Sequence, residues 1–195
     1  MTTTDPGSVL QAIFEESAAA HRRFAAGLGM AALTRAATAI ATAVTHGRKV
    51  LAFGNGGSAT DAEHLVAELV GRFDRERRGL AGVALTADSA VVTAIGNDYG
   101  YDQVFARQIE ALGDKGDVAF GISTSGRSPN VLTALTAAKA RGLTTVALTG
   151  RDGGPMGADA DVHVNVAETS TARVQEVHRT VLHAMCLLVE ELVKA

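Results

Sequence analysis

The chain has 195 residues, of which 47% are hydrophobic, and its formal net charge is −3. This length suits one domain with a substantial core and leaves too little for two of comfortable size. Eighteen basic and 21 acidic residues are spread along the chain without a block of one sign, so nothing favours binding to nucleic acid or to an anionic membrane. We expect a single domain over residues 1–195 that handles a small neutral or anionic ligand with local groups.

The single cysteine, Cys186, lies in the apolar run HAMCLLVEEL and has no partner for an internal disulfide. One such cysteine fits a reducing compartment and a buried, inert thiol. The first residues, MTTTDPGS, lack the basic and apolar regions of a signal peptide, and no apolar run approaches the ~18 residues of a membrane span. We therefore expect a cytoplasmic protein that is not held in a membrane.

Residues 8–46 are rich in alanine and helical in period, with a break at Gly27 to Gly29, and they predict two helices within an N-terminal segment, 1–46. In the remainder, 47–195, short apolar and β-branched runs alternate with stretches of helical length. Strands without polar alternation indicate a parallel sheet that is buried on both faces. The predicted strands are 49–54, 82–87, 117–124, 144–150 and 161–166, and a long last helix is predicted from about Thr171 to Lys194.

This order of elements predicts an α/β fold with a doubly wound, parallel five-stranded sheet of the flavodoxin type, flanked by helices at both ends of the chain. In such sheets ligands bind in the crevice at the carboxyl ends of the strands. The loops after Phe53, Ile122 and Leu148 are therefore the places where a site is expected.

The first of these loops is the turn Asn55–Ser58, with the sequence NGGS. We predict that Ser58 caps a helix that starts near Ala59, with Asp61 in a position like that of a capping box. A helix N-terminus there offers unpaired backbone N–H groups to an anion. The alternative is a tight strand-to-helix turn with a good cap, because the run matches neither GxGxxG nor a Walker loop.

The second loop runs from Ser123 to Pro129 and reads STSGRSP. Pro129 suits the first position of a helix and Ser128 suits its cap. Four hydroxyls and several N–H groups around one helix N-terminus predict a site for a phosphate monoester. The alternative is a turn whose hydroxyls bond only one another, and Arg127 either adds charge to the anion or faces water.

Acid–base groups stand on two predicted helices. His64 and Glu68 are four residues apart, so they share a helix face about 6 Å apart. Gln175 and His183 lie about 12 Å apart along the last helix, so both must lean inward to meet at one point. A glutamate and a histidine are the pair that moves protons between adjacent carbons of a sugar phosphate, and the four side chains also suit a weak metal site. We assign His21, His46 and His163 to surface or structure and give no role to Glu63, Glu176 and His178.

Four stretches carry a family resemblance: GNGGSATDAEHLVAELVGRF, AIGNDYGYDQVFARQ, GISTSGRSPNVLTALTAAKARGLTTVALTGRDGG and RVQEVHRTVLHAM. In this order and spacing, from about Val50 onward, the chain resembles the phosphoheptose isomerases of the sugar isomerase (SIS) domain superfamily. The resemblance implies a homotetramer that converts a phosphorylated seven-carbon sugar, sedoheptulose 7-phosphate, to D-glycero-D-manno-heptose 7-phosphate or a closely related heptose 7-phosphate, with active sites at subunit contacts.

The resemblance also implies roles for individual residues. Glu68 and His183 would be the acid–base pair. One zinc ion per subunit would be held by His64, Glu68, Gln175 and His183. The substrate would be bound by Asn55, Gly56, Gly57, Ser58, Glu68, Asn97, Asp98, Ser123, Thr124, Ser125, Ser128 and Gln175. The chain departs from the family at Arg127, where a small polar residue is common, and at Ala172, where some members carry an acidic residue; both positions bear on the choice of sugar.

Two alternatives use the same scaffold without catalysis. One is a SIS-domain protein that binds the bacterial replication initiator, and the retained Glu68 and His183 argue against it because a scaffold needs no acid–base pair. The other is a sugar-sensing transcription regulator, which lacks support because no helix-turn-helix segment is found at the N-terminus.

The last helix also predicts how subunits meet. Its apolar residues suggest packing against a symmetry mate as well as its own sheet, so that Glu68 and His183 of one site come from different chains. The alternative is that these residues only cover the chain's own core. They are Val181, Leu182, Met185, Leu188, Val189 and Leu192.

Overall fold

The computed structural model describes residues 5–193 and begins with two helices, α1 (Pro6–Ala26) and α2 (Gly29–Thr45). Asp5 caps α1, because its carboxylate accepts hydrogen bonds from the N–H groups of Gly7 and Ser8. The predicted break is confirmed: the chain bends by 74° between the two helices. A Cβ at Gly29 would collide with the ring of Phe24, so the bend depends on glycine there.

From residue 50 onward strands and helices alternate as predicted. The strands are β1 (Val50–Gly54), β2 (Gly82–Ala84), β3 (Val118–Ser123), β4 (Thr144–Gly150) and β5 (Val162–Val166). The remaining helices are α3 (Gly57–Val70), α4 (Ser89–Tyr99), the short 3₁₀ turn η1 (Tyr101–Gln103), α5 (Ala106–Leu112), α6 (Pro129–Ala140), α7 (Gly154–Asp159) and α8 (Thr171–Leu192). β2 is shorter than the predicted strand 82–87, and the predicted helix end at Lys194 lies outside the described residues.

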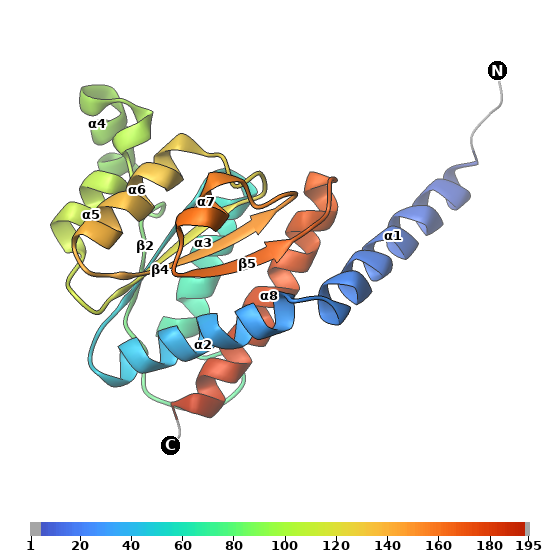
Figure 1. Cartoon of the computed structure of the whole chain (residues 1–195), viewed down its shortest axis with the longest axis horizontal. Helices are drawn as coiled ribbons and strands as arrows, with labels where there is room; N and C mark the ends of the chain where they lie inside the picture. The colour runs from blue at the N-terminus through green and yellow to red at the C-terminus, as the bar shows by residue number, and fades with distance from the viewer. Residues whose placement is uncertain (1–4, 194–195) are drawn as a thin grey trace.

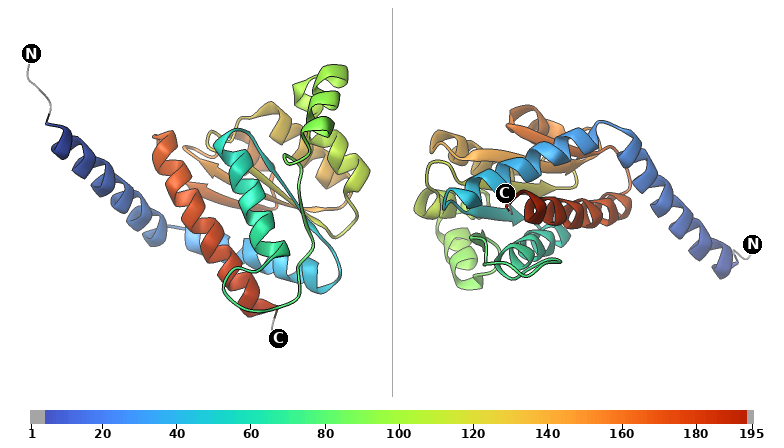
Figure 2. Two further views of the ribbon diagram at one scale, coloured as in Figure 1. Left: turned by 180° about the vertical axis from the view of Figure 1, so that it is seen from behind. Right: turned by 90° about the horizontal axis from the view of Figure 1, so that it is seen from below.

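The five strands form one parallel sheet in the order β2-β1-β3-β4-β5, which confirms the doubly wound α/β prediction. Helices cover both faces: α2, α3 and α8 pack on one, and α4, α5, α6 and α7 on the other (Figures 1 and 2). Every residue of β1 and β3 is buried, as expected for central strands between two helical layers. Gly54 at the end of β1 pairs with Ile122 near the end of β3, so the two predicted loops leave the sheet side by side.

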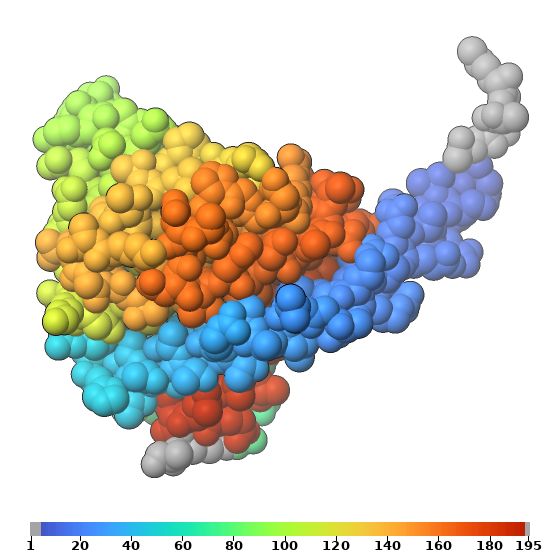
Figure 3. Space-filling model, viewed as in Figure 1, coloured from blue at the N-terminus to red at the C-terminus, as the bar shows by residue number. Residues whose placement is uncertain are grey.

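Helix α1 extends away from the body of the molecule (Figures 1 and 3). The large apolar side chains of its first half, Val9, Leu10, Ile13 and Phe14, stay exposed, up to 75% for Phe14. Within residues 5–193 no single helix is long and apolar enough to cross a membrane, and only α1 and α2 taken together across their bend reach the length and composition of a span.

Most of the apolar residues of α8 that carried the prediction about subunit packing are buried within the chain. Val181, Leu182, Met185 and Val189 are all buried in the chain's own core, against the sheet and α2 and α3. Of the six apolar residues that carried the prediction, only Leu192 is well exposed, at 41%. The four buried residues cover the chain's own core, as the alternative states, and packing of this helix against a symmetry mate stays a prediction that rests on Leu188 and Leu192.

Candidate active site

The turn between β1 and α3 is tighter than predicted. Gly56 has a φ of 57°, in the region that favours glycine, and α3 begins at Gly57. The predicted cap is therefore wrong: Ser58 is buried inside the first turn and makes no capping hydrogen bond. The capping-box role of Asp61 is wrong as well, because Asp61 pairs with Arg179 on α8. The N-terminal N–H groups of α3 are left without a side-chain cap at the sheet edge.

The loop between β3 and α6 gathers its hydroxyls. The Oγ of Ser123 lies 2.9 Å from the Oγ of Ser128 and 3.3 Å from that of Ser125. Ser128 is the residue before α6, as predicted, with Pro129 at the first helical position. Its hydroxyl turns to Ser123 and does not cap the helix, so the α6 N-terminus is free to face an anion.

The backbone between β4 and α7 supports the loop that carries these hydroxyls. Gly126 has a φ of 64°, and a Cβ there would collide with the carbonyl of Gly153. The N–H of Met156 donates to the carbonyl of Gly126 across the same contact, at 3.2 Å. The guanidinium of Arg127 is exposed, as the water-facing alternative predicted, and it also pairs with Asp152, which lies between β4 and α7.

Asn55 is held by two residues that the sequence analysis did not single out. Its amide and that of Asn130 donate to each other at 2.8 and 2.9 Å, which ties the β1 loop to the start of α6. The hydroxyl of Tyr101 donates to Asn55 Oδ1 at 3.2 Å. The available signal in the sequence was a polar residue, Asn130, directly after Pro129 at the start of a helix; in the structure only 2% of Asn130 is exposed.

The acid–base groups meet within one chain. His64 Nε2 lies 2.9 Å from His183 Nε2 and 3.3 Å from Glu68 Oε1. A hydrogen bond at 2.9 Å between these two nitrogens requires one ring to donate and the other to accept. Because Glu68 and His183 both contact His64 of the same chain, the prediction that they come from different chains is wrong.

Gln175 lies over the N-terminus of α3. A Cβ at Gly57 would collide with its side-chain amide, so glycine is required for Gln175 to approach. The structure thus brings Gln175 to the β1 loop and His183 to His64 and Glu68, all along the contact between α3 and α8. Burial lowers the pKa of His64, and the charges of Arg179 and His183 lower it further against the opposing effect of Glu68.

Other predicted residues are less closely engaged. Asn97 and Asp98 lie exposed near the end of α4 and hydrogen-bond each other at 2.8 Å. The carbonyl of Thr124 packs against Gly150, where a Cβ would collide with it. Their roles toward a substrate remain predictions.

The other histidines, the cysteine and the two glutamates named in the sequence analysis have contacts that serve the fold. His178 is fully buried, and its Nε2 donates to the carbonyl of Thr149. Burial raises the pKa of the Cys186 thiol to about 12, which agrees with an inert thiol. Each of the other assigned groups has a hydrogen-bond partner: His21 with Thr180, His46 with the Thr42 carbonyl, His163 with Thr149, Glu63 with Thr86 and Glu176 with Arg173.

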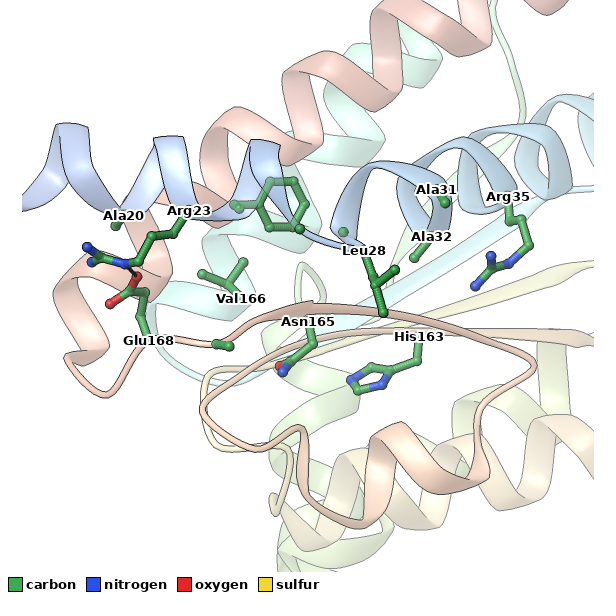
Figure 4. A pocket seen from close by; sticks show the side chains of 14 residues that line it. Ala20, Arg23, Leu28, Ala31, Ala32, Arg35, His163, Asn165, Val166 and Glu168 are labelled. Carbon is green, nitrogen blue, oxygen red and sulfur yellow. Dashed lines mark hydrogen bonds and ion pairs between the residues drawn. The ribbon is translucent and has the colours of Figure 1, made fainter.

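A cavity of about 720 Å³ lies elsewhere, between the bend of α1 and α2 and the outer strand β5 (Figure 4). Its carboxylate, Glu168, is paired with Arg23, and His163 is bonded to Thr149. These cavity side chains are bonded to partners that hold the fold together, whereas His64 contacts both Glu68 and His183 where α3 meets α8. The candidate active site is therefore the α3–α8 contact with its two loops.

Fold and site together define a sugar isomerase domain, and residues 14–150 match the model of the SIS domain family. Curated relatives include the phosphoheptose isomerases of Geobacter sulfurreducens, 55% identical over 78% of this chain and 80% of that protein, and Aquifex aeolicus, 54% identical over 79% and 81%. A solved phosphoheptose isomerase from Neisseria gonorrhoeae is 44% identical, with a TM-score of 0.90 over 96% of this chain and 100% of that one. Another, from Francisella tularensis, is 35% identical with a TM-score of 0.92 over the same shares. The chain therefore belongs to the SIS domain family and, within it, to the phosphoheptose isomerases.

Proposed function

We propose that this chain interconverts sedoheptulose 7-phosphate and D-glycero-D-manno-heptose 7-phosphate. The observation that carries the proposal is the contact of His64 with both His183, at 2.9 Å, and Glu68, at 3.3 Å, on helices that also bring Gln175 to the β1 loop. The hydroxyls of the neighbouring β3 loop face the N-terminus of α6, which suits a phosphate dianion. A phosphate anchor beside an acid–base pair is what an aldose–ketose isomerase needs.

In the proposed reaction Ser123, Ser125 and Ser128 hold the phosphate and so fix the far end of the sugar. Glu68 removes a proton from C1 of the ketose and returns a proton to C2. His183 delivers a proton to the carbonyl oxygen at C2 and removes one from the hydroxyl at C1. The net change moves one hydrogen from C1 to C2 and one from O1 to O2, through an enediol, with no other reactant.

We further propose a zinc ion at His64, Glu68, Gln175 and His183. Across the described residues no three His, Cys, Asp or Glu side chains stand as a ready metal site. The Nε2 atoms of His64 and His183, which are 2.9 Å apart, nevertheless suit a zinc ion. Tetrahedral ligation requires about 3.4 Å between two ligand nitrogens, so the two rings would have to separate by about 0.5 Å. When bound, zinc would polarise the substrate carbonyl as a Lewis acid. A ligated carboxylate is a weaker base, so the metal-ligand role and the general-base role of Glu68 would belong to different states of the site.

We also propose a cytoplasmic homotetramer, assembled through α1. Supporting this, α1 leaves the body of the molecule and exposes an apolar surface, Val9, Leu10, Ile13 and Phe14. Replacing Leu10 and Phe14 by glutamate should convert the tetramer to smaller species in sedimentation velocity, with the fold retained by circular dichroism. A tetramer that survives both changes would place the interface elsewhere.

The reaction is tested by incubating the purified protein with sedoheptulose 7-phosphate in deuterated water. An aldose that carries deuterium at C2 is expected, because the carbon proton passes through a side chain that exchanges with solvent. Absence of both product and label would contradict the proposal and favour a binding protein without catalysis.

A further inference from the structure

Helices α3 and α8 meet along a row of three contacts. On α8, Gln175, Arg179 and His183 follow one another at intervals of four residues and share one face. On α3, their partners in the same order begin with Gly57, below Gln175. Asp61 is next, with its Oδ1 2.7 Å from Arg179 Nη2, and His64 follows, 2.9 Å from His183. Because the residue numbers of the contacting pairs increase along both helices, α3 and α8 run parallel.

The middle contact of this row is an ion pair that the reaction does not use directly. Only 4% of the Asp61 side chain is exposed, against 37% of that of Arg179. A carboxylate this deeply buried is costly without a cation, so the structure strongly favours holding Arg179 against it. The pair therefore fixes one point of contact between α3 and α8, within about one helical turn of both His64 and His183.

We propose that Asp61 and Arg179 are positioning residues. They hold α3 against α8 at the spacing in which His64 meets His183, and thereby set the distance between Glu68 and His183 during proton transfer. The catalytic part of this inference rests on the proposed isomerase function. The effect on rate can be large, because a misplacement of about 1 Å can cost about 100-fold in an enzyme site.

The association of the two helices does not depend on this pair. Leu65 and Leu69 of α3 and Leu182 of α8 are buried in one apolar cluster. At the far end, Glu190 of α8 accepts hydrogen bonds from the N–H groups of the segment 73–75 that follows α3. Loss of the ion pair should therefore change the spacing at the site while the helices stay packed.

The test uses the full chain with Asp61→Asn, Arg179→Gln, the double variant and Arg179→Lys. Steady-state kinetics with sedoheptulose 7-phosphate should show kcat lowered about tenfold or more, with KM changed by less than about threefold. The double variant should be no slower than the slower single variant, because both changes break one contact, and Arg179→Lys should recover part of the rate. Arg179→Gln lies at a partly exposed position and keeps the test valid if Asp61→Asn does not fold.

A second readout is independent of turnover. Nitrogen-15 spectra of the imidazole rings in metal-free protein should show the signals of His64 and His183 displaced in Arg179→Gln, since their mutual hydrogen bond is disturbed. Asp114→Asn is the control: it removes an exposed ion pair with Lys49 at the opposite edge of the sheet and should leave rates and ring signals unchanged.

Unchanged kcat together with unmoved ring signals would overturn the inference. A raised KM at constant kcat would overturn it too, since Arg179 would then bind substrate instead of positioning α8. An inactive wild-type protein would contradict the proposed function, and the ring signals would still decide between positioning and no positioning.

Discussion

The two ends of the α3–α8 pair are built from different chemistry. From the carboxyl ends of the strands to the middle of the pair the contacts are polar and few: Gln175 lies over Gly57, Arg179 pairs with Asp61, and His183 meets His64 beside Glu68. At the far end Glu190, 1% exposed, receives three backbone N–H groups and the guanidinium of Arg77. The far end pairs its buried carboxylate fully and so stabilises the fold, which lets the rest of the contact keep groups that are suited to proton transfer.

The largest expected effect comes at the sheet edge, from Ser125→Ala combined with Ser128→Ala. Each change removes a hydrogen bond to a charged phosphate, so the double variant should lose roughly 3 to 6 kcal/mol of binding free energy. Calorimetric titration with the sugar phosphate measures this. Thr133→Ala, which removes an exposed hydroxyl from the same helix α6, is the control and should bind normally. Normal binding by the folded double variant would remove this loop from the site.

Next in size is the far end, where Glu190→Ala should lower the free energy of unfolding by about 3 to 5 kcal/mol. The reason is that Arg77 and three N–H groups lose their shared acceptor in a buried place. Denaturant unfolding measures the loss. Glu191→Ala, which removes an exposed pair with Arg75, should cost less than about 1 kcal/mol. Equal losses in the two variants would contradict the contrast between the two ends.

Glu68→Gln should reduce turnover by about 100-fold or more, because the variant keeps the size of the side chain and loses the proton acceptor. Stability should stay close to that of the parent, in contrast to Glu190→Ala. Glu63→Gln, on the exposed side of α3, is the matched control and should turn over normally. Near-normal deuterium exchange at C2 in Glu68→Gln would assign the base to another group.

The smallest effect concerns pH and His178, buried beside β4. Burial lowers the pKa of His178 to about 4 from its ordinary 6.5, although its hydrogen bond to Thr149 opposes the shift. As the pH falls below 6.5 the unfolded chain takes up a proton that the folded chain refuses. The stability contributed above pH 6.5 is therefore lost toward pH 4, by about 2 kcal/mol between pH 7 and pH 5.

Unfolding measured at pH 7 and pH 5 in the parent and in His178→Gln isolates this term, since the variant cannot titrate at that position. The parent should lose about 2 kcal/mol more than the variant over this range. Equal losses would show that His178 is protonated equally in both states.

The sequence predicted the sheet well because apolar runs are local properties of the chain. It predicted the residue before α6 equally well, since Pro129 restricts its own backbone. It failed at Ser58, because the positive φ of Gly56 lets the helix start at Gly57, two residues earlier than a cap at Ser58 requires. It also missed the contacts of Asn55 with Asn130 and of Asp61 with Arg179, because no local pattern records which distant side chains meet.

The order in which the chain is synthesised also determines when the site can form. His64 and His183 are 119 residues apart in the chain, and all five strands precede α8. A ribosome therefore completes the whole sheet, the hydroxyl loop and the helix with Glu68 before the residue that finishes the acid–base pair emerges. No nascent chain can bring the pair together until α8 has been made through His183, so topology alone denies the activity to any chain that stops before that residue.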